Sequence, residues 1–259
     1  MTINIIKKLK NSPIANDLYK IKDRFFTINY KYYQPEYLSN KQWDQIDNGN
    51  IESFMKSHCK KYLDRTCVDR AIMIKTSMEL NIPIKGNTLL DLGCSTGFFT
   101  HYFNRLGMIT TGVDSNTHNS IKATTVDAKT SVIQTAKNLN KYYGLKAKFF
   151  ENNIQDFLTK SEKYDVVLCL SLFHHFFEVN AGYGVKKTID LDKLFKLIVS
   201  KTKNILYFEI DHRIADKFGW EESKLHDLLK LKGNFKKVNI IGISFDAHKK
   251  YRRIYECIK

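Results

Sequence analysis

The chain has 259 residues, 43% of them hydrophobic, which is enough for one domain with a buried core and an appendage. Lys and Arg outnumber Asp and Glu by 42 to 27, and the net charge of +15 favours a polyanionic partner such as nucleic acid. An AT-rich coding sequence would produce the same richness in Lys, Asn and Ile, so we leave both explanations open.

Several classes of protein are excluded. The most apolar run, residues 166–177, is too short for a transmembrane segment and carries polar residues. The first ten residues lack the apolar stretch of a signal peptide, so we expect a cytoplasmic protein. The five cysteines are scattered without disulfide or zinc spacing, which predicts free thiols and no metal site.

Residues 1–85 form a Tyr- and Lys-rich block with little strand alternation. Within it, residues 67–80 have helical spacing, because Cys67, Ala71, Ile74 and Met78 would share one face. We therefore expect residues 1–85 to be a helical N-terminal extension or lid, followed by a domain over residues 86–259.

From residue 87 onward, short apolar runs alternate with helical segments, which predicts an α/β, doubly wound fold. The sheet is expected to be mostly parallel and seven-stranded, with a C-terminal antiparallel strand pair. The strands are predicted at 87–92, 108–113, 146–150, 164–170, 204–210, 237–245 and 252–258, and the helices at 98–106, 126–143, 190–201 and 222–231.

Two segments interrupt this alternation, at 116–125 and 178–188. Both follow the carboxyl ends of predicted strands, where ligands bind in such sheets. Long loops there are often functional, but many are only solvated connections, and for the second loop the two interpretations are equally weighted.

A glycine-containing turn, residues 93–97, joins the first predicted strand to a helix, and such a turn lets the backbone approach a ligand. A dinucleotide fingerprint is disfavoured, because Phe98 stands where its last glycine is needed. The same residues match G-x-S-x-G, which leaves a remote alternative: a serine hydrolase with Ser95 as nucleophile, and with Asp192 or Asp211 and His226 or His248 as partners.

A third interpretation comes from resemblance. The pattern Asp91-x-Gly93-x-Ser95-x-Gly97 resembles the first motif of class I S-adenosylmethionine-dependent methyltransferases, with Ser95 replacing the middle glycine. The resemblance implies a Rossmann-like domain over residues 86–259 and S-adenosylmethionine as the cofactor. It assigns this turn to the cofactor, through Asp91, Gly93, Cys94, Ser95, Gly97, Phe98 and Phe99.

Further positions fit the same family. Asp114 ends the second strand beside Ser115, where a carboxylate would accept hydrogen bonds from the ribose hydroxyls. The resemblance implies adenine contacts from the residues after the third strand, and it matches the end of the fourth strand to a Ser-x-x-His-His motif. These residues are Asn152, Asn153 and Ile154, and then Leu170, Ser171, His174 and His175.

Methyl transfer from a sulfonium is an in-line displacement that depends mainly on alignment, and it needs a base only if the acceptor must lose a proton. The candidates for catalysis are His174, His175 and Glu209, with Ser171 and Asp211 also expected to face the acceptor. The histidines are equally interpretable as packed residues, and Glu209 as the mark of an exposed strand face.

The acceptor is not determined by the motifs. An RNA acceptor such as tRNA would explain the positive charge and the aromatic N-terminal block, and it predicts a basic, aromatic-lined face beside the cofactor. A small molecule or a cell-surface glycan is the alternative, and it predicts an enclosed site with charge spread evenly. A non-enzymatic scaffold is a third hypothesis, and the oligomeric state is left open.

Overall fold

The computed structural model describes residues 43–44, 67–115, 131–180, 189–211, 216, 219–245 and 251–259. The predicted loop at 116–125, residues 181–188 of the second predicted loop, residues 126–130 of a predicted helix and His248 lie outside these ranges.

A single seven-stranded sheet has the order β3-β2-β1-β4-β5-β7-β6. Strands β1 to β5 run parallel to one another, whereas β7 runs antiparallel to both β5 and β6. The strands are β1 Thr88–Leu92, β2 Ile109–Asp114, β3 Lys148–Glu151, β4 Tyr164–Leu170, β5 Thr202–Glu209, β6 Lys237–Phe245 and β7 Tyr251–Ile258. The predicted fold class is confirmed, including the C-terminal antiparallel pair.

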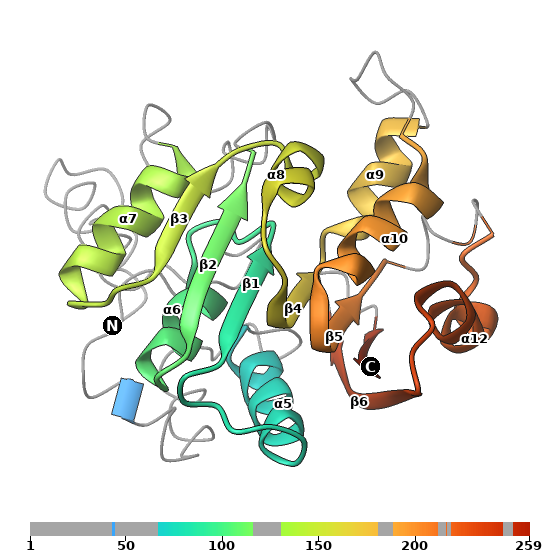
Figure 1. The fold of residues 1–259 in the computed structure, drawn as a ribbon, viewed down its shortest axis with the longest axis horizontal. Helices are drawn as coiled ribbons and strands as arrows, with labels where there is room; N and C mark the ends of the chain where they lie inside the picture. Colours follow the sequence, from blue (N-terminus) through green and yellow to red (C-terminus); the bar gives the residue numbers. More distant parts are fainter. Residues whose placement is uncertain are drawn as a thin grey trace, which may run out of the picture.

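Helices connect the parallel strands, and Figure 1 shows α7 beside β3 at one end of the sheet and α12 beside β6 at the other. The helices are α5 Cys67–Glu79, α6 Phe98–Arg105, α7 Val132–Tyr142, α8 Ile154–Lys160, α9 Phe173–Asn180, α10 Leu191–Ser200 and α12 Glu222–Gly233. None of the helices in the described ranges is both long and apolar enough to span a membrane.

Two of these helices, α8 and α9, were not predicted. Helix α8 has only seven residues, too few for a helical period to show, and it begins where the Asn153 side chain accepts from the backbone N–H groups of Gln155 and Asp156. Helix α9 begins within the same apolar run that contains β4, so the sequence shows no boundary between the two. It also runs to Asn180, so the predicted loop start at residue 178 was wrong.

Alternate residues of the central strands face opposite sides of the sheet, as the pleat requires. Leu90, Val167 and Leu206 belong to one buried cluster, whereas their neighbours Leu89 and Val166 belong to the other. Both faces are therefore apolar, which is the burial expected for parallel strands covered by helices on both sides.

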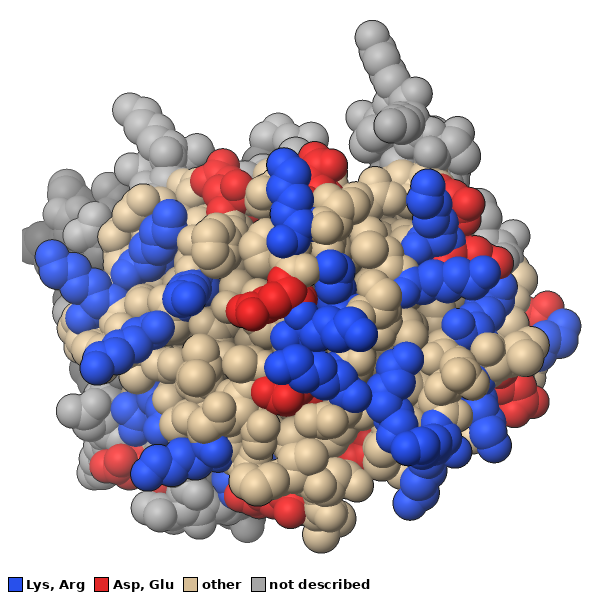
Figure 2. Space-filling view, viewed as in Figure 1, with Lys and Arg blue, Asp and Glu red and all other residues tan. Residues whose placement is uncertain are grey.

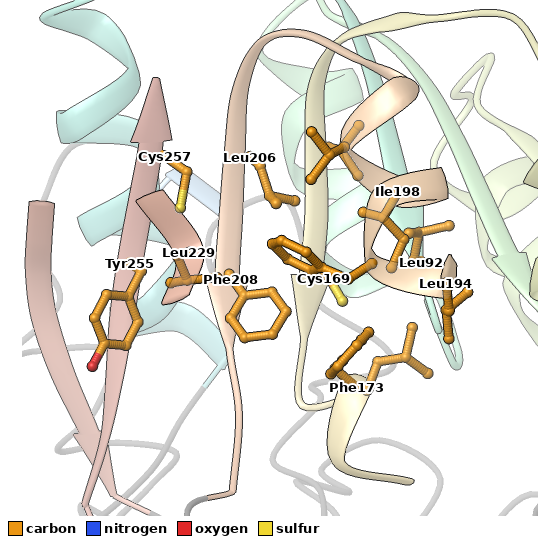
Figure 3. Packing of buried hydrophobic residues seen from close by; sticks show 14 of the residues in the cluster. Leu92, Cys169, Phe173, Leu194, Ile198, Leu206, Phe208, Leu229, Tyr255 and Cys257 are labelled. Atoms are coloured by element: carbon orange, nitrogen blue, oxygen red, sulfur yellow. The ribbon is translucent and has the colours of Figure 1, made fainter. Parts of the chain in front are cut away.

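The first cluster lies between the sheet and helices α8, α9, α10 and α12. Figure 3 shows Phe173 of α9 in this cluster close to Leu194 of α10, with Phe208 and Cys169 projecting from the neighbouring strands β5 and β4. This packing fixes the start of α9 immediately after the carboxyl end of β4.

The second cluster lies on the opposite face, between the sheet and helices α5 and α6. Helix α5 presents Cys67, Ala71, Ile74 and Met78 to it, all completely buried, which confirms the predicted apolar face. Trp43 stacks on Phe98, with 5.8 Å between the ring centroids. Helix α5 thus packs on the sheet, and Trp43 packs on helix α6.

Candidate functional site

The order of the strands reverses between β1 and β4, since β2 and β3 extend the sheet on one side and β5 on the other. In open α/β sheets, ligands bind at this switch point, in the crevice outside the carboxyl ends of the strands. The turn after β1, the end of β2 and the turn after β4 all lie at this edge. Most of the residues singled out from the sequence come from these segments, and the others follow β3 or end β5.

The turn after β1 has an unusual backbone. Gly93 and Gly97 have φ values of 70° and 86°, and Ser95 between them has φ 50°. Left-handed backbone favours glycine, so a serine there carries strain. Gly97 is also the N-cap of α6 and has no side chain to cap it, so backbone N–H groups at the start of α6 are next to the turn.

We expect Gly97→Ala to destabilise the protein by about 2–4 kcal/mol, from left-handed strain and overpacking. A Cβ at Gly97 would lie 2.7 Å from Cε1 of Phe149, and the ring has little freedom because Phe149 is buried. Urea denaturation measures the change. The control is Gly144→Ala, which has φ 65° but nothing within 4 Å of the added carbon, so it should show the strain alone. Equal losses in the two variants would contradict the packing argument.

Asp91 is buried at the end of β1, and its carboxylate accepts a hydrogen bond of 2.7 Å from the Thr100 hydroxyl. Burial raises the pKa of Asp91 to about 6, against the smaller opposing effect of the hydrogen bonds from Thr100. Its visible role is to hold the first turn of α6, and thereby the shape of the glycine turn.

The raised pKa gives a pH-dependent prediction. The unfolded chain ionises Asp91 at its ordinary pKa, so stability is highest below that value and falls as the pH rises through about 6. We expect Asp91→Asn, which does not ionise, to gain about 1–3 kcal/mol relative to wild type between pH 4 and pH 7. Urea denaturation across this pH range measures the difference, and a difference that does not change with pH would refute it.

Asp114 closes β2 next to the glycine turn. Its Oδ2 accepts a hydrogen bond of 3.0 Å from the backbone N–H of Ser95, so the turn and the carboxylate form one unit. The neighbouring backbone is fixed as well, because Asn152 N donates to Asp114 O at 3.0 Å. The structure therefore brings Asp114, Ser115, the glycine turn and Asn152 together, as the sequence predicted.

Other residues expected at the cofactor have side chains engaged elsewhere. Cys94 packs against α7 and Phe98 packs against Trp43. Ile154, the first residue of α8, lies in the core. Asn153 caps α8 rather than presenting its amide to a ligand. Phe99 is buried, with the Arg70 guanidinium over its ring at 5.3 Å.

The turn after β4 has a second strained serine, since Ser171 has φ 54° and follows the buried Leu170. Its neighbour Leu172 touches the first turn, because a Cβ on Gly93 would lie 2.9 Å from Leu172 Cδ1. The two turns therefore pack against each other. The predicted cofactor residues and the predicted acceptor residues meet at this contact.

His174 lies in the first turn of α9 with only 4% of its surface exposed, and its ring centroid is 4.3 Å from that of His175. Burial, His175 and Arg252 lower the pKa of His174 well below its ordinary value, so the imidazole is neutral at neutral pH. Its Nδ1 has no hydrogen-bond partner among the described residues. The neutral ring can accept a hydrogen bond at this nitrogen, but its lowered pKa makes it a weak base.

Glu209 lies fully buried at the end of β5, which answers the question that the sequence left open about its face. Its Oε2 is 2.7 Å from Arg70 Nη1, and its Oε1 is 3.6 Å from Arg252 Nη1. Asp211, two residues further on, is 2.8 Å from Arg252 Nη2. Glu209 is thus neutralised by two arginines, a poor environment for a general base and a good one for a rigid support.

Arg70 and Arg252 were not predicted as site residues. Arg70 comes from α5, before the first strand, and Arg252 from β7, the last. A signal for Arg70 existed in the sequence, because it falls on the same helical face as Cys67, Ala71 and Ile74. A charge on a buried face implies a partner, but the sequence does not name that partner.

Comparison with known proteins agrees with this geometry. A family model described as a methyltransferase domain matches residues 84–238, more than half of the chain.

The chain belongs to this methyltransferase family.

It is a class I S-adenosylmethionine-dependent methyltransferase, as the motifs predicted. Among curated relatives, ubiquinone biosynthesis O-methyltransferase of Coxiella burnetii is 26% identical over 98 residues, covering 38% of this chain and 36% of that protein. The methyltransferase therefore spans little more than a third of this relative's length.

Two solved structures share the fold. WbdD, described as a bifunctional kinase-methyltransferase, superposes with a TM-score of 0.56 at 20% identity, over 88% of this chain and 43% of that one. Magnesium protoporphyrin IX methyltransferase from Synechocystis PCC 6803, with bound S-adenosylmethionine, has a TM-score of 0.50 at 14% identity, over 99% and 96% of the two chains. At these identities the likeness shows the fold alone.

The chain's own residues fit the cofactor. The turn 93–97 offers backbone N–H groups and left-handed positions without bulky side chains, and Asp114 is held against it by Ser95. A carboxylate at this place suits a pair of ribose hydroxyls. The methyltransferase thus has both parts that a nucleoside cofactor needs at the switch point.

The serine hydrolase alternative is not supported. Of its proposed partners, Asp192 is paired with Lys232, Asp211 with Arg252, and His226 with Asp227 and the carbonyl of Val238. None of these interactions involves Ser95. Ser95 instead donates its backbone N–H to Asp114, the arrangement expected of a methyltransferase turn.

Proposed function

We propose that this methyltransferase transfers the S-adenosylmethionine methyl group to a small molecule or a glycan rather than to RNA. The observation that carries the proposal is the burial of the groups on the acceptor side. Four polar or charged residues there are each at most 6% exposed: His174, Glu209, Asp211 and Arg252. Polar groups that are covered in this way suit a compact acceptor, whereas splayed RNA bases need an open surface.

The distribution of charge supports the same acceptor class. Figure 2 shows Lys and Arg spread across the whole of the visible face, with acidic residues between them, rather than gathered into one stripe. An RNA-binding enzyme is expected to concentrate basic and aromatic side chains beside the reaction site. The face in Figure 2 shows no such concentration, so it lends the predicted RNA acceptor no support, and the alternative prediction is the one retained.

The names of the similar proteins point in the same direction. The curated relative is a ubiquinone biosynthesis O-methyltransferase, and one structural neighbour is a magnesium protoporphyrin IX methyltransferase. Quinones and porphyrins are small molecules. The likeness is partial, so it supports the class of acceptor and no particular compound.

The residues of the site divide into a group that binds the cofactor and a group that faces the acceptor. S-adenosylmethionine supplies a methyl group already activated by its sulfonium charge, so the chain mainly has to align the acceptor. The turn 93–97 and Asp114 hold the cofactor, and the turn after β4 faces the acceptor. His174, buried and neutral next to this turn, orients the acceptor by accepting a hydrogen bond at Nδ1.

The test is methyl transfer from methyl-labelled S-adenosylmethionine into a crude lysate, followed by separation of RNA, glycan and small-molecule fractions. We expect the label in the small-molecule or glycan fraction, unaffected by ribonuclease and absent when Asp114→Ala replaces wild type. Label that disappears with ribonuclease would overturn the proposed acceptor. Binding of S-adenosylhomocysteine without transfer to any fraction would favour the scaffold hypothesis.

A further inference from the structure

A buried network of charges joins four elements at the acceptor side of the site. It contains Arg70 of α5, Arg252 of β7, Glu209 and Asp211 at the end of β5, and Ser171 after β4. The four charged residues are between 0% and 6% exposed, and their charges cancel in two ion pairs of 2.7 and 2.8 Å. Burying paired charges is often no better for stability than apolar packing, so stability alone does not explain the network.

The Ser171 hydroxyl lies at the centre of this network. It accepts hydrogen bonds from Arg70 Nη1 at 3.1 Å and Arg252 Nη1 at 3.3 Å, and it donates to Glu209 Oε1 at 3.1 Å. Ser171 is also the residue with φ 54°. A strained backbone persists only where its surroundings hold it, and here the surroundings are three charged side chains.

The strained turn determines where α9 begins. Helix α9 starts at Phe173, two residues after Ser171, and His175 N donates to the carbonyl of Leu172 at 2.9 Å. His174 therefore takes its position from this turn. A change in the Ser171 backbone would move this imidazole relative to the cofactor turn that Leu172 touches.

Both arginines come from outside residues 84–238, the part that the family model matches. Arg70 precedes this part and Arg252 follows it, whereas Asp114 and the glycine turn lie within it. The cofactor half of the site is thus built from the family domain, and the acceptor half is braced by the flanking segments of this chain.

We propose that Arg70 is a positioning residue that lets helix α5 fix the Ser171 turn, and with it His174, on the acceptor side of the methyl-transfer site. Arg70 acts through Glu209 and Ser171 and needs no contact with the acceptor. The contacts by themselves support the claim that Arg70 holds the Ser171 turn in place. The claim that this affects methyl transfer rests on the proposed function.

The variants have to distinguish a local loss of support for the Ser171 turn from a loss of stability of the whole protein. Arg70→Met alone would leave Glu209 with less compensation in the core and destabilise the protein, as removal of one partner of a buried pair does. The double variant Arg70→Met with Glu209→Gln removes both charges and leaves the Arg252–Asp211 pair in place. The matched control is Lys232→Met with Asp192→Asn, a more exposed pair 2.6 Å apart between α12 and α10.

Hydrogen exchange of the full chain, read by mass spectrometry, tests the bracing without an acceptor. We expect the 171–180 segment of the double variant to exchange at least about tenfold faster than in wild type, while β1, β4 and the control pair variant exchange as in wild type. Ser171→Ala, which changes no charge, is also expected to speed exchange of this segment. It replaces the double variant in the test if the double variant fails to fold. Wild-type exchange of this segment in the folded variants would overturn the proposal.

Two further measurements separate this inference from the proposed function. Affinity for S-adenosylhomocysteine should stay within about threefold of wild type in the double variant, because the hydrogen bonds of the two substituted side chains go to neither the glycine turn nor Asp114. Methyl transfer into the labelled lysate fraction should fall at least about tenfold. Arg70→Lys should be intermediate, since the ammonium keeps the positive charge but not the rigid planar fork of the guanidinium. Unchanged transfer would refute the positioning role. Absence of transfer by wild type would refute the proposed function. The hydrogen-exchange result would then decide by itself whether Arg70 holds the Ser171 turn.

Discussion

Asp114→Ala is expected to weaken binding of S-adenosylhomocysteine by about 100-fold, because two hydrogen bonds to a charged group are worth about 3 kcal/mol or more. The variant also removes the partner of the Ser95 backbone N–H, 3.0 Å away, so the glycine turn loses its support. Calorimetric titration measures the dissociation constant. The thermal stabilisation by the ligand should disappear with it, because a ligand stabilises only the state that it binds.

Two controls make the result specific. Asp227→Ala removes an exposed carboxylate on α12, 86% of whose side chain is accessible, and should bind the ligand as wild type does. Asp114→Asn keeps an acceptor oxygen and the size of the side chain, and should fall between Asp114→Ala and wild type. If Asp114→Ala bound the ligand within threefold of wild type, the assignment of the cofactor site would be wrong.

Phe173→Ala is expected to lower the free energy of unfolding by about 3–5 kcal/mol, the usual cost of truncating a fully buried phenylalanine. Phe173 has no exposed surface, and its ring lies 4.9 Å from that of Trp220 and 5.5 Å from that of Phe208. The cavity would open at the first residue of α9, next to His174. Urea denaturation followed by circular dichroism measures the loss.

The matched control is Phe150→Ala on β3, where the side chain is 42% exposed and the expected loss is about 1 kcal/mol or less. Similar losses in the two variants would show that the α9 cluster is not the main support of this part of the core. Binding of S-adenosylhomocysteine should survive in Phe173→Ala as long as the protein is folded, since neither the glycine turn nor Asp114 touches this ring.

The sequence by itself determined the alternation of strands and helices, the glycine turn and the carboxylate of Asp114. These features are local: a buried strand is a short apolar run, and a left-handed turn calls for glycine at Gly93 and Gly97. The cofactor class came from the resemblance of these residues to class I methyltransferases, which could be seen because one strand–turn–helix unit and the end of the next strand make up that half of the site. Asn153 shows the limit of such reasoning, since the helix that it caps was too short to detect.

Only the tertiary structure decided the acceptor side. Arg70 meets Glu209 across 139 positions of sequence, and Arg252 meets Asp211 across 41, so no local pattern could pair them. The sequence marked Glu209 as an odd charge in an apolar strand but allowed an exposed face, whereas the order β4-β5-β7 and the packing of α5 place it in the core between two arginines. Local propensity fixes which elements form, but the burial and pairing of a charge depend on which elements the fold brings together.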